Sequence, residues 1–334
     1  MKRDELNREL AGLRRARIGD RRAPHKPLLL LWLLGRFAAS GGTPGGTAVT
    51  YDEAEEPVSR LINDFGPAVT SPARARERAA MPFVHLERSL WDLRDATGQA
   101  IGTDAPERGG QLRARGAHGR LRPEVEALVA DPAVLAAAAR QLLEQHFTPA
   151  LEALVRDAAG LDLPGLDEEM YAAVPPLSDP SGRSAPSGLS GLSRPARRAR
   201  RAGFAEEVLH AYAYACAFCG FDGALGRHPV GLEAAHVRWH SQDGPDAVDN
   251  GLALCSLHHT LLDLGVLGLV PGPSAGPRIQ VSRLYVTRSE AGRAVDALHG
   301  RPVAPTRPGH PPVSKEFVVW HGRQVFKRPG AAVM

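Results

Sequence analysis

The three cysteines of this chain all lie within one stretch of forty residues. With one histidine they form two pairs of equal spacing, Cys216-x-x-Cys219 and Cys255-x-x-His258. Structural zinc takes four tetrahedral Cys and His ligands, commonly as two such pairs. We therefore predict a structural Zn²⁺ site that closes a folded insert of 35 residues. His258 and His259 are adjacent and only one of them can face the zinc, so the sequence leaves open which one does.

Charge and cysteine usage narrow the class of protein. The formal net charge is +4, the pI is about 9.2, and arginine far outnumbers lysine. Guanidinium groups pair well with phosphate oxygens, which favours a polyanion as partner. A GC-rich coding sequence would also give many arginines, and composition does not separate the two explanations. Three cysteines cannot all form disulfides, so we expect a cytoplasmic protein with a metal site.

The sequence argues against targeting to or through a membrane. The first ten residues are too highly charged for a secretory signal. The longest apolar run, Leu28–Leu34, is far shorter than the roughly 20 residues that span a bilayer. We therefore expect no contact with a membrane and assign this run to a buried helix face.

The composition divides the chain into two parts. Residues 175–195 are rich in Pro, Ser and Gly and have no periodicity, which is typical of a flexible linker. We predict a first domain over residues 1–165, a linker over residues 166–200 and a second domain over residues 201–334. A chain of 334 residues is long enough for two domains of ordinary size.

Local patterns predict a mainly helical first domain. Leu6, Leu10 and Leu13 lie on one face of a helix expected over residues 2–17. Residues 123–157 indicate two further helices. In the second domain the closing segment "KEFVVWHGRQVFKRPG" predicts a hydrophobic strand with Lys and Arg beside it. A solvated edge strand would give the same pattern.

The insert between the cysteine pairs carries further chemistry. "GLEAAHVRWH" predicts a short apolar strand that ends at His236, a Gly/Pro/Asp loop leads to Asn250, and "SLHHTLLDLG" begins a helix that carries His259. This order of strand with His, loop with Asn and helix with His resembles the site of HNH, or ββα-metal, nucleases. The segments "EAAH" and "DNGLALCSLHHTLLDLG" are similar to those of McrA-like restriction nucleases.

The resemblance implies metal-dependent hydrolysis of DNA. Such hydrolysis needs a base that deprotonates water and a cation that neutralises the phosphate and the leaving oxygen. By resemblance His236 is the base, Asn250 holds the loop and orients His236 by a side-chain hydrogen bond, and His259 binds a catalytic Mg²⁺ or Mn²⁺. Asp263 lies four residues after His259 on the same helical face, so it is the expected second ligand.

The sequence departs from this family at one position. Many members carry Asp or His directly before the base as a metal ligand, whereas Ala235 stands here. Glu233, on the same strand face, could replace that ligand, and the sequence does not decide whether it does. His228 and His240 have no assigned role.

The first domain carries a second resemblance. "RRAPHKPLLLLWLLGRF", "FGP" and "MPFVHLERSLWDL" are similar to the sulfur-binding domain of phosphorothioate-dependent McrA-like nucleases, over about residues 18–95. The resemblance implies a small apolar dent for the sulfur, lined by Met81, Pro82 and His85, with Arg36 beside it for the charged oxygen. The family often has Tyr and a small residue where Met81 and His85 stand. The residues expected to contact neighbouring phosphates and bases are Arg74, Arg76, Arg78, His25 and Lys26.

Together these patterns predict an α+β protein, with a mainly helical N-terminal DNA-binding domain and a C-terminal ββα-metal (HNH) nuclease domain joined by a flexible linker. Its predicted function is a type IV-like restriction endonuclease that binds phosphorothioate-modified double-stranded DNA and cleaves nearby phosphodiester bonds. One site per chain and two strands to cut imply a homodimer.

Two alternatives stay open. An HNH restriction nuclease that reads methylated cytosine would need an aromatic cage for a flipped base, and aromatic residues make up only 5% of the chain. A non-catalytic, zinc-stabilised DNA-binding protein would not need His236, Asn250 and His259 in register.

Overall fold

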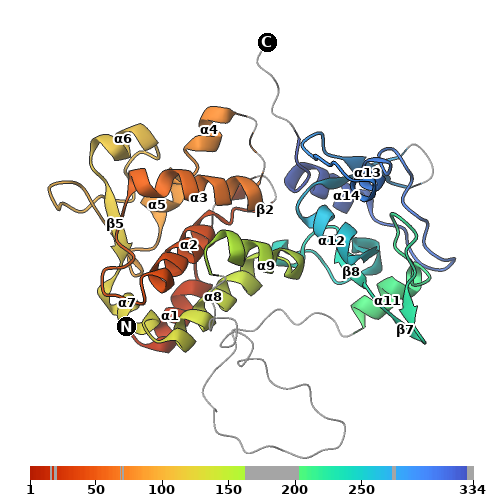
Figure 1. Cartoon of the computed structure of the whole chain (residues 1–334), viewed down its shortest axis with the longest axis horizontal. Helices are drawn as coiled ribbons and strands as arrows, with labels where there is room; N and C mark the ends of the chain where they lie inside the picture. Colours follow the sequence, from red (N-terminus) through yellow and green to blue (C-terminus); the bar gives the residue numbers. More distant parts are fainter. Residues whose placement is uncertain are drawn as a thin grey trace, which may run out of the picture.

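The computed structural model describes residues 1–15, 17–18, 21–67, 69, 71–161, 203–272 and 276–328. The predicted linker over residues 166–200 lies outside these residues. Two lobes lie side by side (Figure 1), and the α+β class expected from the sequence is confirmed. Among the described residues, no helix combines the length and apolarity that crossing a membrane requires.

The N-terminal lobe is mainly helical. Its helices are α1 (Arg3–Ala11), α2 (His25–Ala39), α3 (Tyr51–Phe65), α4 (Pro72–Arg76), α5 (Ala80–His85), α6 (Gly109–Ala114), α7 (Pro123–Val129), α8 (Pro132–His146) and α9 (Pro149–Ala158). Its strands are β1 (Arg17–Ile18), β2 (Arg21–Arg22), β3 (Val49–Thr50), β4 (Trp91–Arg94) and β5 (His118–Leu121). The strands form the hairpin β1-β2 and a three-stranded antiparallel sheet in the order β3-β5-β4.

Helix α2 is the centre of this lobe. Leu28–Leu34 are all buried, as expected for a helix that is apolar on every side. Helices α3, α5 and α8 pack around it. Gly35 allows the end of α9 to approach closely, because a Cβ atom there would lie 2.1 Å from the carbonyl oxygen of Ala159.

The C-terminal lobe combines helices with small antiparallel sheets. Its helices are α11 (Phe204–Ala211), α12 (Ser256–Asp263), α13 (Glu290–Asp296) and α14 (Lys315–Gln324), with the 3₁₀ turns η1 (His240–Gln242) and η2 (Val248–Asn250). Its strands are β6 (Ala224–Leu225), β7 (His228–Pro229), β8 (Leu232–His236), β9 (Gly251–Cys255), β10 (Leu267–Val270) and β11 (Arg278–Val281). They pair as β6-β7, β8-β9 and β10-β11.

Three local predictions differ from this structure. The closing segment forms the helix α14 and not a strand, because its buried residues, Phe317, Val318, Trp320, His321 and Gln324, follow the helical repeat. Residues 123–158 hold three helices and not two, since Pro123, Pro132 and Pro149 each begin one. The first helix is shorter than expected and ends at Ala11, directly before Gly12.

The two lobes share apolar contacts and hydrogen bonds. Trp239 and Trp320 belong to the C-terminal lobe but pack into the hydrophobic core of the N-terminal lobe. The Lys327 Nζ donates to the carbonyl oxygens of Asn63 and Gly66, at 3.0 Å each. The lobes are therefore held together by contacts between side chains far apart in the sequence.

Replacing Trp320 with alanine tests this shared core. The ring is 4% exposed and lies 6.2 Å from the ring of Trp239 between centroids. We expect Trp320→Ala to lower the free energy of unfolding by about 3–5 kcal/mol, as is usual when a buried Trp is truncated. Urea denaturation measures the effect. Leu284→Ala, at a residue 57% exposed, is the control and should change stability by less than about 0.5 kcal/mol. Equal effects of the two substitutions would contradict the assignment.

Candidate active site

The four predicted zinc ligands lie together. The ligand atoms of Cys216, Cys219, Cys255 and His258 are all within 4.8 Å of one another, and the His258 Nδ1 lies 3.2 Å from the Cys255 Sγ. Zn–S bonds of about 2.3 Å in a tetrahedron place ligand atoms at similar separations. Three thiols and one imidazole nitrogen are a donor set typical of structural zinc, so the residues present fit this ion. His258 is the histidine that faces the thiols, which settles the choice between His258 and His259.

The loop that carries the first two thiols is folded tightly. The Gly220 N–H donates to the carbonyl oxygen of Cys216, and the Cys216 N–H donates to that of Phe221. Gly220 has a φ of +79°, a conformation that glycine adopts without strain. Burial raises the pKa of Cys216, but hydrogen bonds from His258 and from backbone N–H groups outweigh it and lower the pKa to about 6. A thiol held as thiolate is the form that binds metal.

His236 lies at the end of strand β8 that is farther from this cluster. Strand β8 pairs antiparallel with β9, so that Leu232 lies opposite Cys255 and His236 opposite Gly251. Helix α12 follows β9 directly, which completes a ββα unit. The His236 ring stacks on the ring of Phe204, with 4.3 Å between centroids and 21° between planes. The His236 Nε2 lies 2.7 Å from the Asp246 Oδ1.

Asn250 holds the loop between the two strands. Its side-chain oxygen accepts from the backbone N–H of Arg238 at 2.8 Å, and its side-chain nitrogen donates to the carbonyl oxygens of Arg238 and Pro245 at 3.0 and 2.9 Å. Asn250 is fully buried. The expected loop-fixing contacts are present. The His236 side chain itself contacts Asp246.

His259 faces the other side of α12 from the zinc cluster. Its Nδ1 lies 2.6 Å from the Glu233 Oε2, and its Nε2 lies 3.4 Å from the Asp263 Oδ2. The hydrogen bond from His259, together with one from Ser256, outweighs partial burial and lowers the pKa of Glu233 to about 2. Glu233 is therefore a carboxylate at neutral pH, and two carboxylates flank one imidazole.

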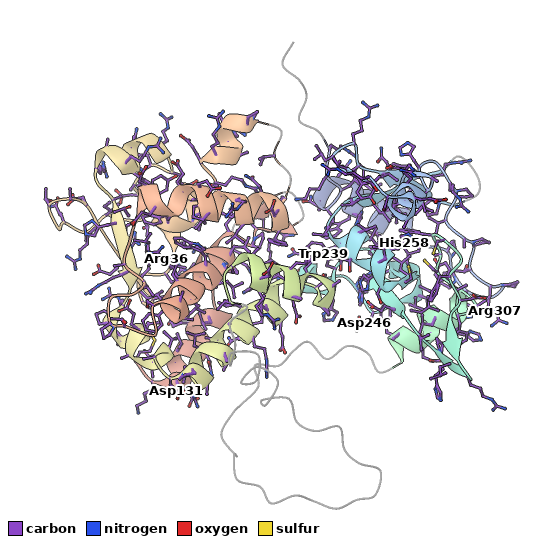
Figure 2. The ribbon with its side chains drawn as sticks, viewed as in Figure 1. Arg36, Asp131, Trp239, Asp246, His258 and Arg307 are labelled. Carbon is purple, nitrogen blue, oxygen red and sulfur yellow. The ribbon has the colours of Figure 1, made fainter. Side chains whose placement is uncertain are left out.

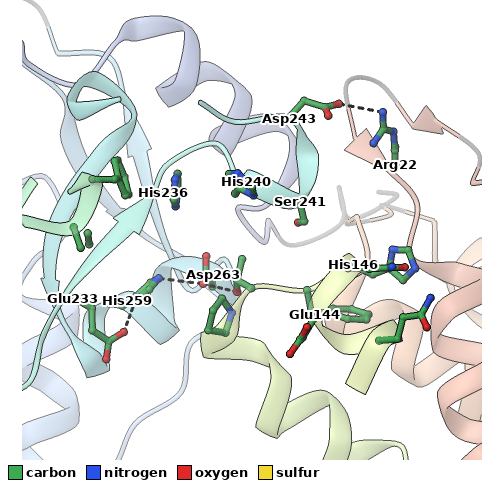
Figure 3. A pocket seen from close by; sticks show the side chains of 18 of the residues that line it. Arg22, Glu144, His146, Glu233, His236, His240, Ser241, Asp243, His259 and Asp263 are labelled. Carbon is green, nitrogen blue, oxygen red and sulfur yellow. Dashed lines mark hydrogen bonds and ion pairs between the residues drawn. The ribbon is translucent and has the colours of Figure 1, made fainter. Parts of the chain in front are cut away.

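These groups line a hollow of about 780 Å³ to which both lobes contribute (Figure 3). From the N-terminal lobe, the Thr148 Oγ1 donates to the Asp263 Oδ2 at 2.6 Å. Across the hollow, the Arg22 Nη2 lies 3.2 Å from the Asp243 Oδ2. Burial and the neighbouring Arg22 lower the pKa of Arg15, which also lines the hollow, to about 10. A polyanion that entered would meet arginines and histidines as well as carboxylates.

The N-terminal lobe carries the expected basic surface on one short helix. Arg74 and Arg76 are exposed on α4. The helix is held against α3 by its backbone, because the Ser59 hydroxyl donates to the carbonyl oxygen of Arg76 and the Asn63 Nδ2 donates to that of Ala75. The arginine side chains are thereby presented to solvent on a fixed backbone.

Three residues expected at this surface are buried. Arg78 is 7% exposed and donates to the Asn63 Oδ1 at 3.1 Å, with the His25 Nε2 at 3.1 Å from its other terminal nitrogen. Burial lowers the pKa of Arg78 to about 10. The Lys26 Nζ donates to the Glu87 Oε1 at 2.7 Å. In this structure His25, Lys26 and Arg78 are buried and paired with protein groups, and their expected contacts with DNA stay a prediction.

The proposed dent lies on α5. Pro82 is buried, while Met81 and His85 are half-buried and one helical turn apart. The His85 Nε2 lies 2.6 Å from the Glu107 Oε1. Arg36, on α2, places its guanidinium 5.1 Å from the centre of the Trp32 ring. Within the described part of the chain, the buried Arg36 Nε has no hydrogen-bond partner.

Sequence reasoning missed two residues of the C-terminal site. Asp246 has no counterpart in the expected set, although it stands four residues before Asn250 in a Gly-Pro-Asp turn that the pattern did single out. Thr148 comes from the other lobe, and no local signal identifies it. Figure 2 shows Asp246 on the side of the C-terminal lobe that faces the N-terminal lobe, with His258 deeper in the lobe.

Comparisons with known proteins divide the chain in the same way. Residues 3–163 match the family model described as ScoMcrA-like, DNA sulfur-binding domain, and residues 216–270 match the model described as HNH endonuclease. The solved sulfur-binding domain of SprMcrA, complexed with phosphorothioated DNA, is 21% identical with a TM-score of 0.39, and covers 48% of this chain and 95% of its own. That of ScoMcrA, in the same kind of complex, is 24% identical with a TM-score of 0.39 and covers 49% and 97%. No curated protein matches the chain.

The zinc site generates a test that needs no activity. We expect Cys216→Ser to abolish stoichiometric zinc and to unfold the C-terminal lobe, because bound metal contributes folding free energy in such sites. Elemental analysis and thermal unfolding measure the two effects. His228→Ala, at an exposed histidine of the same lobe, is the control and should retain one zinc per chain. A purified wild-type protein without zinc would overturn the assignment.

Proposed function

We propose that this chain, which joins a ScoMcrA-like DNA sulfur-binding domain to an HNH endonuclease domain, is a type IV-like restriction endonuclease. It binds double-stranded DNA that carries phosphorothioate linkages and hydrolyses nearby phosphodiester bonds. The observation that carries this proposal is the site geometry at β8, β9 and α12. His236, Asn250 and His259 occupy the strand, the loop and the helix of one ββα unit, and two carboxylates flank His259.

The residues that would hold the catalytic cation are His259, Asp263 and Glu233. Carboxylate and imidazole ligands fit Mg²⁺ or Mn²⁺, and Glu233 supplies the carboxylate that Ala235 cannot. When bound, the cation neutralises charge on the phosphate and on the leaving oxygen. Cys216, Cys219, Cys255 and His258 hold a separate structural Zn²⁺.

His236 supplies the base. A histidine titrates near neutral pH, so its neutral ring can take a proton from a water molecule at the phosphate. The oxygen of that water forms a bond to phosphorus, the bond from phosphorus to the leaving 3′ oxygen breaks, and solvent protonates the leaving oxygen. Asn250 keeps the loop beside the base in one conformation through its bonds to Arg238 and Pro245.

The N-terminal lobe supplies recognition. Arg74 and Arg76 contact phosphates, and Arg36 holds the charged oxygen of the modified phosphate with a donor that lacks a protein partner in the described structure. Met81, Pro82 and His85 form the apolar contact for the sulfur. Beneath this surface, Arg78 bonds Asn63 and His25, and Lys26 bonds Glu87. These bonds hold the backbone that follows α4 and the start of α2 in place.

Domain limits and assembly complete the proposal. The recognition domain covers residues 1–165, a linker covers residues 166–200 and the nuclease domain covers residues 201–334. Cleavage of both strands by one site per chain requires two copies, so the active form is a homodimer on DNA. Sedimentation of the protein with a modified duplex would measure this stoichiometry.

Replacing the base separates binding from cleavage. We expect His236→Ala to reduce the single-turnover cleavage rate by roughly 10²–10⁴-fold, the usual contribution of a general base. Binding of the modified duplex should be unchanged within about twofold, because the base acts only in the chemical step. His228→Ala is the matched control and should cut like wild type. Normal cleavage by His236→Ala would refute the role of His236.

Charge and sulfur discrimination should separate by mutation. Arg74→Ala and Arg76→Ala should weaken binding to modified and plain duplexes alike, and each should lower the salt slope of log K by about 1. Met81→Glu should leave binding of plain DNA within a few-fold and abolish the preference for sulfur. Arg3→Ala, on α1, is the control arginine.

Titrations with paired duplexes that differ by one sulfur atom, at two salt concentrations, make the measurement. A wild-type protein without preference for sulfur in any sequence context would refute the recognition proposal. It would favour a reader of methylated cytosine instead.

A further inference from the structure

Asp246 makes a short polar contact to the proposed base. Its Oδ1 lies 2.7 Å from the His236 Nε2, and the side chains of both residues are only 9% exposed. Its second oxygen, Oδ2, lies 3.8 Å from the His240 Nε2. A carboxylate this little exposed, at this distance from an imidazole, fixes which ring nitrogen carries the proton.

The position of Asp246 is itself fixed by Asn250. The Asn250 side chain donates to the carbonyl oxygen of Pro245, the residue directly before Asp246. It also bonds both backbone groups of Arg238, two residues after His236. The Asn250 side chain therefore holds the loop at two points, just after His236 and just before Asp246.

The plane of the His236 ring is restrained by an aromatic side chain. Phe204, at the start of α11, stacks at 4.3 Å between centroids. Stacking restrains the plane of the ring but not its rotation within that plane. A directional hydrogen bond to Asp246 removes the remaining freedom.

We propose that Asp246 is the positioning residue of the base: its carboxylate accepts a hydrogen bond from His236 Nε2–H, so that Nδ1 carries the lone pair that takes the proton from water. The inference rests on the proposed function and names a further residue of the same site. Asn250 then orients His236 indirectly, by fixing the loop that carries Asp246.

The carboxylate also assists the chemical step. In the ground state His236 is neutral and donates through Nε2. When the O–H bond of the water breaks, its proton moves to Nδ1, its oxygen bonds to phosphorus, and the ring becomes an imidazolium. A carboxylate 2.7 Å away stabilises that positive charge more in the transition state than in the ground state.

Other charged groups near His236 do not take this place. His240 shares Asp246, and Glu233, His259 and Asp263 line the same hollow. The carboxylates of Glu233 and Asp263 contact the ring of His259 instead. Asp246 lies within hydrogen-bond distance of the His236 Nε2.

The experiment compares Asp246→Asn, Asp246→Glu and wild type as full-length protein. Single-turnover cleavage of a phosphorothioated duplex is measured at saturating protein across pH 5–9, with Mn²⁺ present. We expect Asp246→Asn to lose about 10- to 1,000-fold in rate, within the contribution of the base itself. Binding of the duplex should stay within about twofold, and Asp246→Glu should recover part of the lost rate.

The pH profile distinguishes positioning from a merely structural role. The base must be neutral, so the rate rises with pH as His236 loses its proton. Without the neighbouring anion the imidazolium is less stable, and the rising limb should move to lower pH in Asp246→Asn. Asp296→Asn, an exposed carboxylate on α13, is the control and should match wild type.

Three results would overturn the proposal. They are an unchanged rate in Asp246→Asn, a lower rate with an unmoved rising limb, and a loss that appears in binding and not in rate. ¹⁵N NMR of labelled histidine gives a readout that needs no cleavage. If wild type cuts no DNA but His236 is Nε2-protonated only when Asp246 is present, the proposed function is refuted while the hydrogen bond between Asp246 and His236 is confirmed. If Asp246→Asn leaves the tautomer of His236 unchanged, the proposed role of Asp246 is refuted and the proposed function is not affected.

Discussion

The C-terminal lobe depends on the first turn of α12, where two adjacent histidines serve two different sites. Successive residues of an α-helix point about 100° apart, because one turn takes 3.6 residues. His258 therefore faces the three thiols while His259 faces Glu233. Cys255 ends β9 and lies opposite Leu232 of β8, so the cluster also fixes the register that places His236 opposite Gly251. The helix turn that carries one residue of the proposed zinc site thus also carries one of the proposed catalytic groups.

Helix α9 is one of the N-terminal segments that reach this site, together with the end of α8 and the residues around Arg22. Thr148 at the start of α9 contacts Asp263, and the far end of α9 packs on Gly35, the residue beside Arg36. A helix of ten residues is about 15 Å long, and α9 thus acts as a strut of that length between α2 and α12. The sequence places these residues more than a hundred positions apart, so their contact is a property of the fold alone.

Short sequence patterns predicted the features that a few neighbouring residues determine. The Cys and His spacing predicted that Cys216, Cys219, Cys255 and His258 cluster, and the apolar run Leu28–Leu34 predicted the buried central helix. Both signals are contained in a few neighbouring residues. The helix α14 was taken for a strand because a short run of apolar residues fits either period, and only packing against β10 decides between them.

The burial of single basic residues could not be predicted from local patterns. Arg74, Arg76 and Arg78 have the same side chain and equal spacing, yet only Arg78 turns inward to Asn63 and His25. The chain leaves the helix α4 after Arg76, and the direction of the next side chains then depends on tertiary contacts. Asp246 was missed for the same reason, since its partner lies ten residues away across a loop whose path Asn250 determines.

The separation of α4 and α5 gives the proposed recognition its logic. Replacing one phosphate oxygen with sulfur leaves the net charge unchanged, so arginines such as Arg74 attract both ligands almost equally. Discrimination requires a contact whose free energy differs between a poorly hydrated sulfur and a strongly hydrated oxygen, and only an apolar side chain such as Met81 provides it. Because the two residues lie on different helices, mutations can alter affinity and selectivity independently. In this proposal α4 sets the affinity for any DNA, while α5 sets the preference for DNA that carries sulfur.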